Sequence, residues 1–197
     1  MSDDNLTGRS TLRGVGQKTL RYVLRKLAVH ENVQFGRNFR VGRGVVVSSP
    51  HGLNIGNGVS VGPRSIIQVD GVIGDFTLIG MGVQIVGRDD HAIDEVGRPY
   101  VFSTWAGDRV GTNRDKVRIG RDVWIGGGSI VLSGVSIGEG ALIGSGSVVT
   151  RDIPRYAIAV GNPAKVIGDR FDKEDQIDHS RLLDELCVRL YGVNSKH

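Results

Sequence analysis

The sequence predicts an all-β solenoid, a parallel β-helix of hexapeptide repeats, and three observations support this fold class. Aliphatic residues recur at every sixth position, a period that belongs to neither an α-helix nor an isolated strand. Gly accounts for 30 of the 197 residues, about twice its average share, which indicates a tight turn that repeats. Aromatic residues make up only 6% of the chain, so Ile and Val must fill the interior.

The six-residue period runs along most of the chain in three ladders of apolar residues. The first ladder reads Phe35, Val41, Val47, Leu53. The second reads Ile55, Val61, Ile67, Ile73, Ile79, Ile85. The third reads Ile119, Ile125, Val131, Ile137, Ile143, Val149. Such regularity is the signature of a repeat architecture.

Each hexapeptide also carries a turn signal and a second inward position. The third residue after the aliphatic one is often a Gly or Asp, types that tolerate positive φ, at Gly58, Asp70, Gly82, Asp122, Gly128, Gly134, Gly140, Gly146, Asp152. The fourth is small or β-branched, at Val59, Ser65, Thr77, Val83, Val123, Ser129, Val135, Ala141, Ser147. Each unit is therefore predicted to be one short strand and one turn, with a large and a small side chain facing inward. Successive coils would stack at about 4.8 Å.

Helices are predicted at both ends of the solenoid. Thr11–Val29 has an amphipathic apolar pattern and would cap the first coil, as part of an N-terminal region 1–32. Residues 33–167 form the solenoid domain, and 168–197 form a C-terminal region. In that region we expect a second helix over Lys173–Tyr191, with Asp172 as a possible N-cap.

Charge and composition limit the partners and the compartment. The net charge is +4, and basic residues cluster at Arg9, Arg13, Lys18, Arg21, Arg25, Lys26. Their one-sided arrangement favours a solvated helix face, with anionic lipid or nucleic acid as the alternative partner, and we predict no nucleic-acid partner. Cys187 is the only cysteine, which excludes an internal disulfide. No signal peptide or apolar run of about 20 residues is evident, so a cytoplasmic location is expected.

The ladder stops between Ile85 and Ile119, which predicts an inserted segment over residues 87–117. A long insertion in a compact solenoid is usually functional, because it can project over a binding face. His91 opens the segment, and nearby carboxylates such as Asp94 could orient its imidazole. A lone His is otherwise more often structural. His51 lies at an early coil corner, where a surface turn is favoured over an acceptor site.

The C-terminal half of the solenoid resembles a known family. The segments "DVWIGGGSIVLSGVSIGEGALIGSGSVVTRDIP" and "VGNPAKVI" are similar to the hexapeptide-repeat acyltransferases, in the subgroup of bacterial sugar O-acetyltransferases and streptogramin and chloramphenicol acetyltransferases. The resemblance covers about residues 33–167. It implies left-handed triangular coils of three hexapeptides each, and a homotrimer whose active sites lie between subunits.

The resemblance also implies a reaction. It is acetyl transfer from acetyl-CoA to a hydroxyl of a sugar or polysaccharide precursor, with His91 as general base. Which of the neighbouring carboxylates Asp89, Asp90, Asp94 and Glu95 orients the imidazole is left open, and Asp94 is the candidate that we name. Imidazole has the pKa suited to this role. Direct transfer needs neither a metal nor an enzyme nucleophile, so Cys187 is expected to be buried packing.

Acetyl-CoA needs a narrow slot and positive charge for its phosphates. Small residues that recur one coil apart would line the slot, at Gly126, Gly127, Ser129, Gly144, Ser145. Trp124 would flank it, and Lys165 and Arg151 are candidate phosphate contacts. The alternatives are turn residues for the glycines and serines, a subunit contact for Trp124, and solvated charges for Lys165 and Arg151.

The acceptor is the least constrained part of the prediction. Gln84 is a candidate acceptor contact, and Tyr100 and Trp105 suit stacking on a sugar ring or anchoring of the inserted segment. An antibiotic acetyltransferase of the same build is the nearest alternative. A metal-dependent hydratase resembling the gamma-type carbonic anhydrases needs several His ligands, and only His91 lies in the relevant region. A non-catalytic β-helix is the remaining alternative.

Overall fold

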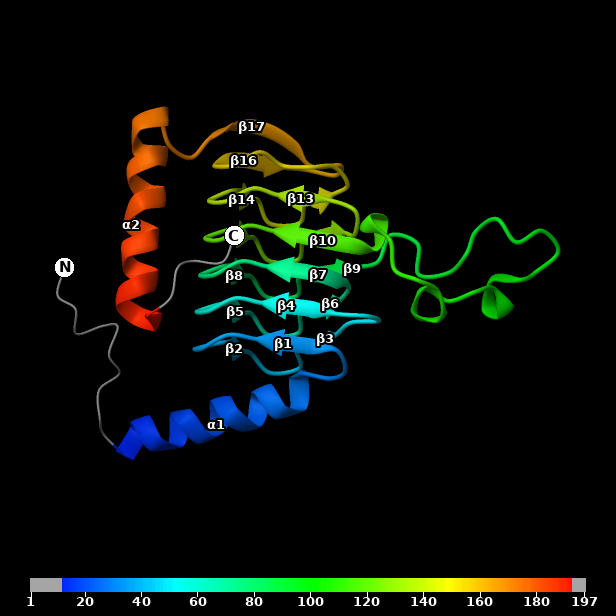
Figure 1. The fold of residues 1–197 in the computed structure, drawn as a ribbon, viewed down its shortest axis with the longest axis horizontal. Coiled ribbons are helices and arrows are strands. Elements are labelled where there is room, and N and C mark those ends of the chain that lie inside the picture. The colour runs from blue at the N-terminus through cyan, green and yellow to red at the C-terminus, as the bar shows by residue number, and fades with distance from the viewer. Residues whose placement is uncertain (1–11, 193–197) are drawn as a thin grey trace.

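The computed structural model describes residues 12–192 and shows a left-handed parallel β-helix of stacked triangular coils (Figure 1). Three sheets form the faces of the resulting prism. Face A contains β3 (Val46–Ser48), β6 (Ile66–Gln68), β9 (Gln84–Val86), β12 (Ile130–Leu132), β15 (Val148–Val149). Face B contains β1 (Val33–Phe35), β4 (Leu53–Ile55), β7 (Asp70–Ile73), β10 (Lys116–Ile119), β13 (Ser136–Ile137).

Face C is the longest of the three sheets. It contains β2 (Arg40–Val41), β5 (Ser60–Val61), β8 (Leu78–Ile79), β11 (Trp124–Ile125), β14 (Leu142–Ile143), β16 (Ala157–Val160), β17 (Lys165–Asp169). All neighbours pair in parallel except β17, which pairs antiparallel with β16. The chain runs from face B to C to A in each coil, so the turns define a BC corner, a CA corner and an AB corner.

The interior follows the six-residue ladders predicted from sequence. The ladder residues from Val41 to Val149 are buried, and so are the small or β-branched residues four positions later. In-register pairing stacks identical residues, as in the row Ile55, Ile73, Ile119, Ile137. The prediction was wrong for Phe35, the first residue of the ladders. Its side chain is exposed, because the first coil has a neighbouring coil on one side only, and it packs on Phe39 with ring centroids 5.3 Å apart.

Positive φ recurs at the predicted turn position, with two exceptions. Asp122 and all six glycines of the pattern adopt it, whereas Asp70 and Asp152 do not. Asp70 begins β7 instead, and Asp152 accepts a hydrogen bond from the Ser136 amide at 2.7 Å. Arg64 and Phe76 take the same turn with φ of 59° and 61°, so the stacked coils impose this conformation even on residues that disfavour it.

Two helices cover the prism. α1 (Leu12–Ala28) lies across the first coil, where Leu24 and Ala28 pack on the core, and Thr11 of the predicted helix lies outside the described residues (Figure 1). α2 has the predicted bounds, Lys173–Tyr191, and runs along the prism. Its N-cap is Asp172, whose side chain accepts from the Asp175 amide at 2.9 Å. No helix within residues 12–192 has the length and apolarity needed to cross a membrane.

A buried ionic network fixes α2 to the BC corner. Arg121 is 1% exposed and pairs with Glu139, Nε to Oε1, at 3.2 Å. Its Nη1 pairs with Asp184 of α2, and its Nη2 donates to the Ser180 hydroxyl at 2.7 Å. Cys187 of α2 is buried in the same interface, as the sequence predicts.

We expect Arg121→Ala to lower the free energy of unfolding by about 3–5 kcal/mol, because it removes the buried cation of Glu139 and leaves that carboxylate paired only with the exposed Arg155. Asp184→Ala removes the more exposed partner, 54% accessible, and should cost about 1 kcal/mol or less. Urea unfolding of both variants measures the difference. Equal losses would mean that Arg121 contributes only its contact with α2.

Candidate functional site

The three corners of the prism carry different structures. The AB corner carries the inserted segment, which leaves the prism after β9 and returns at β10 (Figure 1). The BC corner is covered by α2, through contacts such as His179 with Asp122 at 2.8 Å and the stacking of Tyr191 on Phe76. The CA corner carries neither the inserted segment nor α2.

The inserted segment, residues 87–115, is ordered by short local contacts. It contains three 3₁₀ turns: η2 (Tyr100–Phe102), η3 (Ala106–Asp108), η4 (Asn113–Asp115). His91 and Trp105 form an isolated antiparallel bridge that joins its two branches. Two ion pairs hold its root, Arg109 with Asp115 at 2.6 Å and Arg114 with Asp89 at 2.8 Å.

The ring of His91 is held by Ser103 on the opposite branch. Nδ1 lies 3.3 Å from the Ser103 carbonyl oxygen and 3.4 Å from its hydroxyl oxygen. The hydroxyl donates its proton to the Tyr100 carbonyl at 2.9 Å. Both Ser103 oxygens can then only accept from the ring, so Nδ1 carries the proton and Nε2 keeps its lone pair.

Asp94 does not take the position that the sequence suggested. Its side chain is exposed, and the His91 nitrogen that it would orient faces Ser103. The neighbouring carboxylate, Glu95, accepts hydrogen bonds from the amide and hydroxyl of Thr104, which lower its pKa. The group that orients His91 is therefore a backbone carbonyl, because the two branches of the segment pair at this point.

The CA corner presents a strip of bare backbone. Gly82, Gly128 and Gly146 occupy equivalent turn positions on successive coils with φ of 65°, 70° and 71°. A Cβ at any of the three would meet no atom within 4 Å, so open space lies in front of the strip. Ser145 and Trp124 are exposed beside it, and so is Lys165 at the upper end, next to β16.

The predicted coenzyme residues divide between this corner and other places. Gly126 lies at the corner, but its role is packing, since a Cβ there would stand 2.5 Å from the Ser145 amide nitrogen. Gly127 and Gly144 lie at the same corner on successive coils. Ser129 does not line the slot as predicted, because it is fully buried and its hydroxyl donates a hydrogen bond to the Gly144 carbonyl at 3.0 Å.

Arg151 lies at a different corner from the glycine strip. It follows β15 and belongs to the AB corner, where it is exposed. His91 also starts from the AB corner. Within one chain, the imidazole and the glycine strip therefore belong to different edges of the prism.

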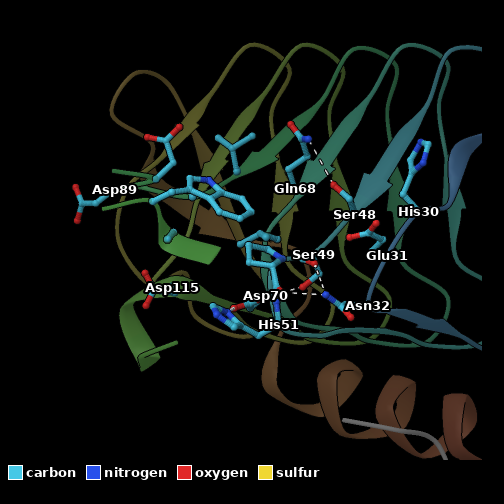
Figure 2. Close-up of a pocket in the computed structure, with 17 residues that line it drawn as sticks. His30, Glu31, Asn32, Ser48, Ser49, His51, Gln68, Asp70, Asp89 and Asp115 are labelled. Atoms are coloured by element: carbon cyan, nitrogen blue, oxygen red, sulfur yellow. Dashed lines mark hydrogen bonds and ion pairs between the residues drawn. The ribbon is translucent and has the colours of Figure 1, made fainter. Parts of the chain in front are cut away.

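A cavity of about 900 Å³ lies between the inserted segment and the coils (Figure 2). It is lined by His30, Glu31, Asn32, Ser48, Ser49, Pro50, His51, Gln68, Val69, Asp70, Val86, Gly87, Asp89, Asp90, Trp105, Ala106, Asp115. Trp105 thus lines the cavity as an acceptor contact would. Tyr100 is exposed on the segment outside the cavity lining, and Gln84 points outward from face A. The glutamine that lines the cavity is Gln68, one coil below and in register with Val86.

His51 and Asp70 form a pair in the wall of this cavity (Figure 2). His51 Nδ1 lies 2.7 Å from Asp70 Oδ2, and this hydrogen bond raises the pKa of the imidazole. Burial opposes ionisation of Asp70, but bonds from Ser49, His51 and Gly52 outweigh it and lower its pKa. The sequence favoured an ordinary surface turn at His51, whereas the structure holds the His51 imidazole in a fixed orientation in the cavity wall.

Comparison with known protein families and solved structures identifies proteins that are similar to this chain. Residues 116–151 match the bacterial transferase hexapeptide family (six repeats). The chain is 31% identical to a maltose O-acetyltransferase from Clostridium difficile 630, over 83% of this chain and 80% of the other, with a TM-score of 0.50. This chain belongs to the hexapeptide-repeat acyltransferases.

Other members of the hexapeptide-repeat acyltransferases match over shorter or more divergent stretches. Chloramphenicol acetyltransferases from Agrobacterium fabrum and Klebsiella aerogenes are 37% and 38% identical over 119 and 112 residues, which are 52% and 53% of this chain. The chain spans about half the length of these curated relatives, 53% in each case. AntD, an N-acyltransferase from Bacillus cereus, shares the fold with a TM-score of 0.60 and 21% identity, over 81% of this chain and 85% of AntD.

Two residues of the candidate site were not identified from the sequence. Ser103 has no motif that marks it, because its contact with His91 depends on the pairing of the two branches. Asp70 occupies a turn position of the repeat in the sequence, and only the structure shows that it lacks the positive φ of a turn residue such as Asp122. Among residues 12–192, no group of three or more His, Cys, Asp and Glu is placed to hold a metal ion.

The His51–Asp70 bond should stabilise the fold most at mildly acid pH. Because Asp70 raises the pKa of His51 above 6.5, this contribution is complete below the unfolded value and is lost as the pH rises through the folded value. The difference in unfolding free energy between wild type and His51→Ala should therefore shrink from about pH 6 to pH 8. Urea unfolding across this range measures it. A difference that grows with pH would contradict the assignment.

Proposed function

We propose that this protein is an acetyl-CoA-dependent O-acetyltransferase that transfers an acetyl group to a hydroxyl of a sugar or polysaccharide precursor. The observation that carries the proposal is the tautomer of His91, whose Nδ1–H is held by Ser103 while Nε2 keeps its lone pair. The similarity to a maltose O-acetyltransferase supports the sugar acceptor.

In the proposed reaction, His91 acts as general base. Nε2 takes the proton of the acceptor hydroxyl while the oxygen attacks the thioester carbonyl. The resulting oxyanion is stabilised by backbone N–H donors, and collapse of the intermediate expels the CoA thiolate. The imidazolium returns the proton to the sulfur, so acetyl ester and free CoA leave and His91 is neutral again. The Ser103 carbonyl stabilises the imidazolium that forms, since it accepts from Nδ1–H throughout.

The CA corner fits the pantetheine arm of acetyl-CoA. The open space in front of Gly82, Gly128 and Gly146 lets a thin chain lie against the backbone. Trp124 and Ser145 flank the strip, and Lys165 supplies positive charge at its end. Coenzyme A and 3-hydroxybutyryl-CoA complexes of AntD are consistent with an acyl-CoA donor on this fold.

A homotrimer would complete the site. His91 starts from the AB corner and the glycine strip lies at the CA corner, so a second copy is needed to bring the thioester to the imidazole. The exposed apolar residues of the inserted segment, among them Val96, Val101 and Phe102, suit burial against that copy.

An antibiotic acetyltransferase is the second candidate function. It is favoured by the similarity to two chloramphenicol acetyltransferases over about half of the chain. The donor, the base and the assembly would be the same, and only the acceptor would differ. A thiol-release assay with acetyl-CoA separates the two, using maltose and related sugars against chloramphenicol.

We expect His91→Ala to lower kcat by about 10²–10⁴-fold, because the hydroxyl then loses its general base. Asp94→Ala is the matched control on the same segment, and it should stay near wild type because Ser103 orients the ring. Thiol release under saturating acetyl-CoA gives both values. Unchanged turnover in His91→Ala would remove this residue from the mechanism.

Mixed assemblies test whether one site uses two copies. Ser145→Trp would obstruct the strip at an exposed position, and it should be inactive by itself, as His91→Ala is. Co-refolding the two inactive variants should restore a fraction of the activity, because some sites then combine an intact imidazole with an intact strip. If each chain formed its own site, mixing would restore nothing.

A further inference from the structure

We propose that the cavity beneath the inserted segment binds the acceptor as a neutral or amino-bearing sugar ring, with His51 as a positioning residue for one of its hydroxyls, and that it rejects phosphorylated and nucleotide-linked sugars. This inference rests on the proposed function and adds the substrate class. AntD was solved with dTDP and a dTDP-linked sugar, so the two proteins would differ in acceptor.

The charge of the cavity wall is the first argument. Among residues 12–192, five carboxylates line the cavity, at Glu31, Asp70, Asp89, Asp90, Asp115, and no Lys or Arg does. Three of them are already paired, Asp89 with Arg114, Asp115 with Arg109 and Asp70 with His51. Glu31 and Asp90 add negative charge to the wall. A phosphate placed here would meet like charges at short range, whereas hydroxyl and ammonium groups can donate to them.

The fixed imidazole of His51 is the second argument. Asp70 is 2% exposed and accepts from the Ser49 hydroxyl at 2.5 Å and from the amides of His51 and Gly52 at 2.8 and 3.1 Å. With this carboxylate immobilised, its bond to Nδ1 sets the orientation of the ring. The His51 side chain remains 34% exposed at the cavity, so its other edge can hydrogen-bond a ligand.

The position relative to His91 is the third argument. The cavity includes Asp90, the residue before His91, and Trp105, which pairs with His91 across the segment. An indole face suits the C–H face of a sugar ring. A ring held between Trp105 and His51 would therefore lie beside the His91–Trp105 bridge, and His91 itself is not one of the residues that line the cavity.

Binding without acetyl-CoA tests the cavity separately from the reaction. The probes are methyl α-glucoside, glucosamine and glucose 6-phosphate, with calorimetry or saturation-transfer NMR as the readout. The first two should bind, and glucose 6-phosphate should bind at least about tenfold more weakly. The proposal would be overturned if glucose 6-phosphate bound as tightly as the other two probes or more tightly. It would also be overturned if neither methyl α-glucoside nor glucosamine bound, even if acetyl transfer to another acceptor is observed.

Kinetics then tests the role of His51. His51→Ala should raise KM for the acceptor by about tenfold or more and change kcat and KM for acetyl-CoA by less than about threefold. His51→Gln, which keeps a hydrogen-bonding end, should recover part of the loss. Asn54→Ala, on the exposed side of β4, is the control. A fall in kcat with unchanged acceptor KM would contradict the positioning role.

A different part of the molecule carries a second inference. We infer that α1 is a docking surface for an anionic membrane surface. The helix sequence Leu12–Ala28 contains five basic residues and no acidic one, counting Arg13, Lys18, Arg21, Arg25, Lys26. Leu20, Val23 and Leu27 recur at spacings of three and four and are 47%, 44% and 70% exposed. Exposed apolar residues flanked by cations are what an interfacial helix presents to anionic lipid.

The place of α1 in the fold suits this role. It lies across one end of the prism, with Leu24 and Ala28 on the core, and its N-terminal half extends past the coils (Figure 1). Arg25 is engaged over the ring of Phe35 at 5.1 Å, while Arg21 and Lys26 are exposed. The end of the prism therefore offers both charge and apolar area, away from the inserted segment.

Vesicle sedimentation tests the docking surface. The full chain should pellet with phosphatidylcholine vesicles that contain about 30% phosphatidylglycerol and not with pure phosphatidylcholine, and the bound fraction should fall as salt rises. Leu20→Ser combined with Leu27→Ser should weaken binding by about tenfold, whereas Leu182→Ser on α2 should not. Equal pelleting of all variants would contradict the inference. The inference would also be contradicted if the same double variant lost self-association in the absence of vesicles, because the exposed face of α1 would then bind a second copy of the chain.

Discussion

The stacking of coils at the CA and BC corners is the constraint on which the rest of the structure depends. Consecutive turns approach so closely that a Cβ at Gly126 or Gly74 would stand 2.5 Å from the next coil's backbone, and one at Gly120 would stand 2.6 Å from it. Side chains are excluded from these contacts, and the interior rows of Ile and Val are brought into register. The positive φ of Arg64 and Phe76 shows how strongly the stack dictates local conformation.

The three corners of the stack carry different structural features. The BC corner is closed by α2 and its buried Arg121 network, so it contributes stability. The CA corner stays open along Gly82, Gly128 and Gly146. The AB corner holds the inserted segment, the cavity and both histidines that we assign to the reaction, His91 and His51. A site that needs the open strip and the imidazole must therefore combine two corners.

The sequence predicted the repeating part of this architecture well, because burial in a solenoid follows a period that can be read directly. The ladders, the inward small residues and the bounds of α2 all appear in the structure. Phe35 was misplaced because the pattern does not tell where the stack ends. Ser129 was misplaced because a small residue can face inward or line a surface, and only its register decides.

The candidate site was less predictable, since it is built from contacts between distant residues. His91 could be singled out by its place in the inserted segment, but its Ser103 partner depends on how two irregular branches pair. Asp70 shows the opposite difficulty: it fits the repeat as a turn residue and instead closes a corner with Ser49 and His51. Gln68 rather than Gln84 lines the cavity because Gln68 ends its strand at the AB corner, in register with Val86, whereas Gln84 begins its strand.

The way the inserted segment joins the prism has a consequence for the diversification of this scaffold. β7 and β10 pair in register as neighbours, from Asp70 with Lys116 to Ile73 with Ile119, although the segment lies between them in sequence. The excursion therefore adds no height to the stack and breaks none of its ladders. A segment of another length or composition can be exchanged at this junction while the coils above and below keep their pairing, so the cavity at the AB corner can be rebuilt without altering the glycine strip at the CA corner.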